Sequence, residues 1–122
     1  MLRILVVEDH PDLRETLSLL LEGDGRQIES AESAEAALRA FTGDPFDVVF
    51  TDVKLPGLSG VELAVRLHTQ RPDTWIVLSS GGPVAAPADG VAARTRFLGK
   101  PFTMEALDAL MAEFEAGAER ER

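Results

Sequence analysis

Short apolar runs alternate with amphipathic helical segments along the chain, and this alternation is the strongest constraint on its fold. The run at residues 2–7 (LRILVV) is β-branched and nearly all apolar, as in a strand buried on both faces. Leucines at helical spacing follow it, beginning after Pro11 and ending before Gly23. Because this strand-then-helix unit recurs, we predict a parallel sheet with right-handed crossovers and helices on both faces.

Five strands and their connecting helices can be placed by turn and capping residues. After the strand at 2–7, further strands are expected at 26–30, 47–51, 75–79 and 96–98. Helices are expected between Ser33 and Phe41, between Ser59 or Gly60 and Gln70, and after Thr103. The inward residues expected in the last two are Val61, Ala64, Val65 and Leu67, and then Leu107, Leu110, Met111 and Phe114.

The segment between the fourth and fifth strands is the exception to this regular pattern. Residues 81–94 (GGPVAAPADGVAAR) contain two prolines and three glycines, which interrupt helical periodicity. We therefore expect the fourth helix to be short or irregular, and the segment to be unusually mobile.

Composition limits the functional classes open to the chain. Its 122 residues, 45% hydrophobic and 27% charged, suit one globular domain, expected at 1–116 and followed by a frayed charged tail at 117–122. A net charge of −9 opposes direct binding to nucleic acid or anionic lipid. There is no cysteine, no apolar run of about 20 residues and no signal-peptide pattern, so we expect a cytoplasmic protein with no thiolate chemistry.

Chemically active side chains follow four of the predicted strands. Glu8 and Asp9 follow the first strand and Asp52 the third, a serine at 79 or 80 ends the fourth, and Lys100 follows the fifth. In open α/β sheets the ligand crevice lies beyond the carboxyl ends of the strands, so these side chains should converge.

Three carboxylates facing one crevice would raise one another's pKa unless a cation neutralises them. Mg²⁺ prefers oxygen ligands and keeps several waters, which suits Asp9 and Asp52 as direct ligands and Glu8 through water. Zinc is disfavoured because the chain has neither cysteine nor a histidine pair. His10 is interpreted as a turn residue at the rim of the site rather than as a ligand.

Asp52 could be a helix cap, a turn residue, a metal ligand or a nucleophile. Ser59 already provides a cap for the following helix, which weakens the first interpretation. Carboxylates accept phosphoryl groups, and the charge that develops on the three phosphoryl oxygens then needs a cation or a donor for each. Mg²⁺, Lys100 and the serine hydroxyl would provide these, which makes Asp52 the candidate phosphoacceptor.

Four motifs together give the chain a resemblance, over nearly its whole length, to the receiver domain of two-component response regulators. They are VVEDHPDLR, DVVFTDVKLPGLSG, WIVLSSGG and FLGKPF. The resemblance implies a flavodoxin-like fold, Mg²⁺ dependence, transfer of phosphate to Asp52 from a sensor histidine kinase or a histidine phosphotransfer protein, and slow autodephosphorylation in a regulatory domain rather than an enzyme.

The resemblance also assigns roles to individual residues. Glu8 and Asp9 match the acidic pair, Lys100 matches the lysine before a usually cis proline, and the backbone carbonyl of Lys54 matches a metal ligand. Between the two serines we prefer Ser80, because a small residue follows it, and Phe97 matches the mobile aromatic that moves with this hydroxyl. The implied partner surface, which could also form a homodimer, combines 81–94, the fifth strand and the last helix.

Other functions stay open at this stage. A haloacid-dehalogenase-like phosphatase also uses an aspartate nucleophile with Mg²⁺, but it needs a second aspartate where this chain has Lys54. A degenerate receiver that acts only as a docking module would not need every reactive residue. Within the receiver interpretation we favour a stand-alone regulator over a phosphate sink or a module of a hybrid histidine kinase.

Overall fold

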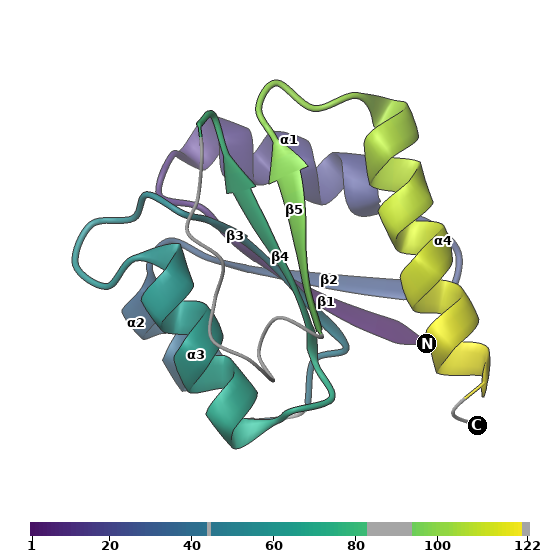
Figure 1. Cartoon of the computed structure of the whole chain (residues 1–122), viewed down its shortest axis with the longest axis horizontal. Helices are drawn as coiled ribbons and strands as arrows, with labels where there is room; N and C mark the ends of the chain where they lie inside the picture. Colours follow the sequence, from purple (N-terminus) through teal and green to yellow (C-terminus); the bar gives the residue numbers. More distant parts are fainter. Residues whose placement is uncertain (44, 83–93, 121–122) are drawn as a thin grey trace.

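The computed structural model describes residues 1–43, 45–82 and 94–120. Five strands form one sheet, and helices cover both of its faces (Figure 1). The elements are β1 (Leu2–Val7), α1 (Pro11–Leu21), β2 (Arg26–Ala31), α2 (Ala34–Ala40), β3 (Val48–Asp52), α3 (Gly60–Gln70), β4 (Trp75–Ser80), β5 (Thr95–Gly99) and α4 (Met104–Arg120). The expected short or irregular helix and its mobility fall almost wholly on 83–93, outside the described residues.

The order of the strands creates the crevice that the sequence predicts. All neighbouring strands pair in parallel, in the order β2-β1-β3-β4-β5. The chain first proceeds from β1 outward to β2 and then returns to place β3 on the other side of β1. Because the order reverses between β1 and β3, the loops that follow these two strands diverge and leave a crevice at their carboxyl ends.

Side chains that alternate along the strands supply two separate apolar layers. Leu5, Val7 and Val49 face α2 and α3, whereas Ile4, Val6 and Phe50 face α1 and α4. The helices bury one stripe each, formed by Leu63, Ala64 and Leu67 in α3 and by Leu107, Met111 and Phe114 in α4.

The sequence-based prediction is wrong for one residue that was expected to face inward. Val65 is 41% exposed. A helix turns about 100° per residue, so once Leu63, Ala64 and Leu67 occupy the buried face, Val65 lies beyond its edge.

Local capping explains where three of the helices begin. The hydroxyl of Ser33 accepts a hydrogen bond from the backbone of Ala36, and that of Thr103 accepts one from Ala106. Ser59 and Glu62 form a reciprocal capping box at the start of α3.

The last helix is longer than the sequence suggests. Helix α4 continues to Arg120, beyond residue 116, where the frayed tail was expected to begin. Alanine, glutamate and arginine in this stretch are strong helix formers, which explains the extension. The domain boundary itself stays a prediction.

Among the described residues, no helix has the length and apolar character needed to cross a bilayer.

Candidate functional site

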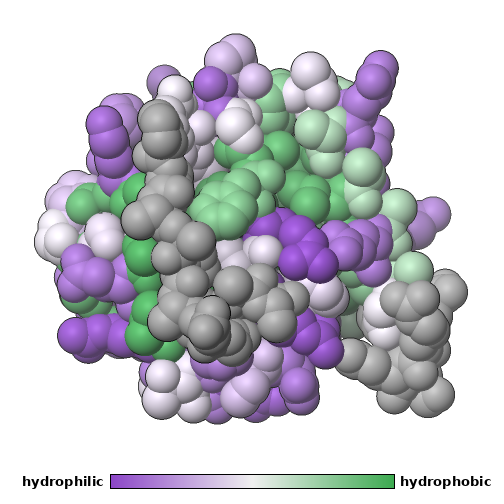
Figure 2. Space-filling model, in the orientation of Figure 1, coloured by the Kyte–Doolittle hydropathy of each residue, from purple (hydrophilic) through white to green (hydrophobic). Residues whose placement is uncertain are grey.

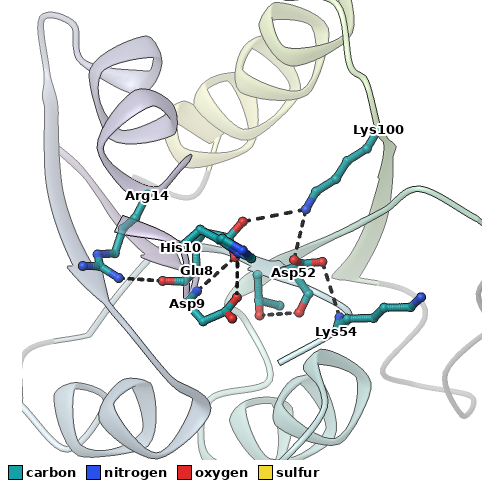
Figure 3. Close-up of polar contacts among 8 residues, drawn as sticks. Glu8, Asp9, His10, Arg14, Asp52, Lys54 and Lys100 are labelled. Atoms are coloured by element: carbon teal, nitrogen blue, oxygen red, sulfur yellow. Dashed lines mark hydrogen bonds and ion pairs between the residues drawn. The ribbon is translucent and has the colours of Figure 1, made fainter. Parts of the chain in front are cut away.

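The carboxyl ends of β1, β3 and β5 bring three charged side chains into contact (Figure 3). The Nζ of Lys100 lies 3.0 Å from Oδ2 of Asp52 and 3.8 Å from Oε1 of Glu8. Parallel pairing makes this meeting possible, because every strand then ends at the same edge of the sheet. The ammonium therefore bridges carboxylates from two strands that lie more than 40 residues apart in the sequence.

Two hydrogen bonds fix Asp52, one to its carboxylate and one to its backbone carbonyl. The backbone N–H of Lys54 donates to Oδ1 of Asp52 at 3.3 Å, and the hydroxyl of Thr51 donates to the Asp52 carbonyl at 3.0 Å. The Asp52 side chain is 15% exposed, so a carboxylate oxygen can be reached from solvent while the strand fixes its position. These features suit a nucleophile better than a turn residue.

The acidic pair is ordered by a network within the loop after β1. Glu8 is 6% exposed, and its Oε2 accepts a hydrogen bond from the backbone of Asp9 at 3.0 Å. The guanidinium of Arg14 donates to the carbonyl of Glu8 at 2.8 Å, as Figure 3 shows. The ligand atoms of Glu8, Asp9 and His10 lie within 4.8 Å of one another. His10 has its Nδ1 3.5 Å from Oδ1 of Asp9 and a side chain that is 69% exposed, and its interpretation as a rim residue rather than a ligand stays a prediction.

The electrostatics of this cluster favour a bound cation. The pKa of Glu8 is raised above its ordinary value, first because burial penalises the charged carboxylate, then through its hydrogen bond with Asp9 and the charge of Asp52. The ammonium of Lys100 acts in the opposite direction but does not cancel these effects. Lys100 is one positive charge among three carboxylates, those of Glu8, Asp9 and Asp52, and carboxylate oxygens are the ligands that a hard divalent ion prefers.

Strand register decides which serine lies beside Asp52. Ser79 is the pairing partner of Asp52, and partners in a parallel sheet project to the same face. Its Oγ is buried and has no hydrogen-bond partner among the described residues. Ser80, which the sequence favoured, projects to the other face, and its hydroxyl accepts a hydrogen bond from Gly82 at 3.2 Å. The register places Ser79 on the same face as Asp52, and the choice between the two hydroxyls stays a prediction.

Ser79 also lines a cavity of about 290 Å³ that reaches Asp52 and Lys100. Most of the other lining residues are apolar and come from β1, α1, β3 and the segment around Phe102. Ser80 is not among them. Ser79 therefore shares one cavity with Asp52 and Lys100.

Two further predictions concern β5 and the residues after it. The Lys100-Pro101 peptide bond is cis, as the resemblance implied. Phe97 lies on β5 with half of its surface exposed, where the mobile aromatic was expected. Its role as a switch residue and the role of the Lys54 carbonyl stay predictions.

Sequence reasoning missed Arg14 and Gly60. Arg14 has no feature in the sequence that separates it from a surface arginine, because its partner is a backbone carbonyl. Gly60 packs so closely on β3 that an added Cβ would lie 2.2 Å from the carbonyl oxygen of Asp52. Its position directly after the Ser59 cap was the only signal, and it pointed to the helix start rather than to the site.

Comparison with known proteins decides the family. A family model described as the response regulator receiver domain matches residues 4–112. The chain belongs to this family. This receiver domain is 37% identical over 111 residues to the transcriptional regulatory protein TcrA of Mycobacterium tuberculosis, covering 88% of this chain and 43% of TcrA. It is 34% identical over 109 residues to the response regulator receiver protein CpdR of Brucella abortus, covering 88% of this chain and 91% of CpdR.

Solved structures of receivers share the fold. The response regulator TrrA of Thermotoga maritima, in complex with Mg²⁺-BeF, is 31% identical, with 93% of this chain and 99% of that chain covered and a TM-score of 0.79. TrrA bound to the histidine kinase ThkA is 32% identical, with 93% and 98% covered and a TM-score of 0.80. These matches confirm the predicted five-stranded receiver fold. The chain spans about half or less of the first curated relatives that it matches.

Proposed function

We propose that this receiver domain accepts a phosphoryl group on Asp52 in a two-component phosphorelay. The observation that carries the proposal is the 3.0 Å contact between Lys100 Nζ and Asp52 Oδ2 at the carboxyl edge of the sheet, in a member of the receiver family. A helix cap or a turn residue would not need the ammonium of Lys100 from another strand beside its carboxylate. A haloacid-dehalogenase-like phosphatase is disfavoured by the family match.

The donor would be a phosphohistidine of a sensor kinase or of a histidine phosphotransfer protein. An oxygen of Asp52 attacks phosphorus, the P–N bond to the donor imidazole breaks, and its electron pair returns to the ring nitrogen. Asp52 then carries an acyl phosphate, and Lys100 is close enough to pair with one of the phosphoryl oxygens instead of the carboxylate. A serine hydroxyl of β4 would donate to a second oxygen, either that of Ser80, which the sequence favours, or that of Ser79, which shares a cavity with Asp52.

The acidic residues fit a magnesium ion. Asp9 and Asp52 would bind it directly, Glu8 through water, and the backbone carbonyl of Lys54 would complete the protein ligands. Bound Mg²⁺ would neutralise charge on the transferring phosphoryl group. The clustering of Glu8 and Asp9 at the carboxyl end of β1 supports this assignment. The complex of TrrA with Mg²⁺-BeF supports it by relationship.

Phosphorylation would act as a switch on the partner surface. New negative charge at Asp52 can draw in the hydroxyl on β4, with Phe97 moving inward from its half-exposed position. We propose that the surface formed by β5 and α4 binds a downstream protein or a second copy of the chain; most of 81–94, which the sequence also assigns to this surface, lies outside the described residues. The complex of TrrA with histidine kinase ThkA supports a kinase as the upstream partner.

We further propose a cytoplasmic, single-domain regulator that undergoes self-phosphorylation from small donors and slow autodephosphorylation. CpdR, most of which the chain covers, supports the single-domain arrangement. A phosphate sink or a module of a hybrid histidine kinase remains the alternative architecture.

The decisive experiment is intact mass spectrometry after incubation with acetyl phosphate and Mg²⁺. Wild type should gain the mass of one phosphoryl group, and Asp52→Asn should gain none. Asp47→Asn is the matched control, because Asp47 lies at the amino end of β3, at the other end of the strand from Asp52. This variant should be phosphorylated like wild type. Equal phosphorylation of Asp52→Asn and wild type would contradict the assignment.

A further inference from the structure

Helices α2 and α3 lie side by side on one face of the sheet and leave a groove between their C-terminal halves (Figure 1). Two apolar residues of the groove, Leu38 and Val65, come one from each helix. Two arginines, Arg39 and Arg66, also come one from each helix. Each helix thus contributes one apolar and one cationic residue to the groove.

The two apolar residues of the groove differ in burial, because Leu38 is partly buried against the core whereas Val65 is exposed. Val65 keeps 41% of its surface in contact with solvent, although the helix has other positions that are buried completely. A β-branched residue loses side-chain freedom in a helix, so packing normally offsets its presence there. On the face that Figure 2 shows, hydrophobic surface gathers mainly around the carboxyl end of β5 and toward α1 and α4. Val65 is therefore the apolar surface that a docked partner would cover.

The charge of the groove is opposite to that of the chain. The protein carries a net charge of −9, yet no carboxylate of the described residues lines the groove. Neither Arg39 nor Arg66 makes an ion pair with another described residue. Arg39 lies in the last turn of α2, where it complements the helix dipole, but Arg66 lies in the middle of α3 and has no such explanation.

We propose that this groove docks an acidic amphipathic helix of a partner protein. Apolar side chains of that helix would cover Leu38 and Val65, and its carboxylates would pair with Arg39 and Arg66, which can each form two parallel hydrogen bonds. Thr42 and Thr69 add little, because their hydroxyls already donate to backbone carbonyls. Charge complementarity selects an acidic partner over a basic one or nucleic acid.

The groove is remote from the phosphorylation site along α3. Gly60, at the start of this helix, donates to the carbonyl of Val53 beside Asp52. Val65 and Gln70 come later in the helix, which at 1.5 Å per residue places them about 8–15 Å further along its axis. Docking should therefore occur with or without a phosphoryl group on Asp52, and the proposal does not depend on the proposed function.

The test is a titration of ¹⁵N-labelled protein with designed peptides, followed by amide chemical shifts. The probe is a helix-forming peptide of about 18 residues with leucines at i, i+4 and i+7 and glutamates on its other positions. A second peptide replaces the glutamates with lysines. We expect saturable shifts centred on α2 and α3 with the acidic peptide, weakening as salt is raised, and none with the basic peptide. Asp52→Asn should bind the acidic peptide as wild type does.

Charge and shape variants test whether the groove itself is responsible. Arg39→Glu combined with Arg66→Glu should weaken binding about tenfold or more, and Val65→Asp should also weaken it. Arg71→Glu and Leu19→Asp are the matched controls, because both residues are exposed and neither lines the groove. Absence of saturable binding, equal binding of both peptides, or variants that bind like wild type would each overturn the proposal.

Discussion

Gly60 offers a sharp test of how packing positions the phosphoacceptor. A Cβ added at this residue would lie 2.2 Å from the carbonyl oxygen of Asp52 and 2.9 Å from the Cα of Val53. Both neighbours are backbone atoms of the strand end and its loop, so no flexible side chain can move aside. Relief of the clash requires α3 to move away from β3, or the end of β3 to move with Asp52.

Two opposed contributions decide whether Gly60→Ala raises or lowers the free energy of unfolding. In a helix, Gly→Ala normally stabilises by about 0.5–1 kcal/mol, because alanine loses less backbone entropy. Overpacking of this kind costs about 1–3 kcal/mol, and contact between two backbones should lie at the upper end. We expect Gly60→Ala to lose about 2–2.5 kcal/mol of unfolding free energy, which lowers the urea midpoint by about 1 M for a domain of this size. Because Asp52 must shift, its phosphorylation by acetyl phosphate should slow as well.

Equilibrium urea unfolding and intact mass after acetyl phosphate measure the two effects on the same sample. Gly99→Ala is the matched control, since a Cβ there meets nothing within 4 Å, and it should change stability by no more than about 0.5 kcal/mol. If Gly60→Ala were as stable and as readily phosphorylated as Gly99→Ala, the close approach of α3 to β3 would not be what holds Asp52 in place.

Three further predictions follow from burial, charge and register. The pKa of Glu8 is raised in the folded state, so the folded protein binds this proton more tightly than the unfolded chain does. The free energy of unfolding should therefore fall as the pH rises from about 4.5 through the folded pKa. In metal-free urea titrations, Glu8→Gln should gain stability relative to wild type across this pH range. Met111, 1% exposed, should lose about 2–5 kcal/mol on Met111→Ala in thermal or urea unfolding, whereas a loss under about 0.5 kcal/mol would refute its place in the core. Ser79→Ala should slow phosphorylation of Asp52 about tenfold or more while Ser80→Ala changes it little, and the reverse order would restore the sequence-based preference.

Local patterns predicted most of the secondary structure because the forces that set it act within a few residues. Ser33, Ser59 and Thr103 each accept a backbone hydrogen bond at the helix start where the sequence placed them. The apolar run at 2–7 matches β1 residue for residue. Where the prediction was wrong, at Val65, the period was right but the edge of the buried face was decided by packing against the sheet.

The candidate site divides in the same way. Glu8, Asp9, Asp52 and Lys100 could be identified from the sequence because each directly ends or follows a strand, and parallel strands share one edge. The choice between Ser79 and Ser80 could not, because it depends on the register of β4 against β3. Arg14 was missed for a related reason, since its partner is a backbone carbonyl that any residue could provide.

The sequence by itself thus determined which elements form, the edge at which they end and the chemistry available there, because hydrophobic period, caps and turns are local properties. Only the tertiary structure decided which serine shares a face with Asp52, how closely Gly60 approaches it and which residues of α2 and α3 line one groove. These contacts depend on the relative positions of segments far apart in the chain, and those positions are set by packing of the whole sheet with its helices.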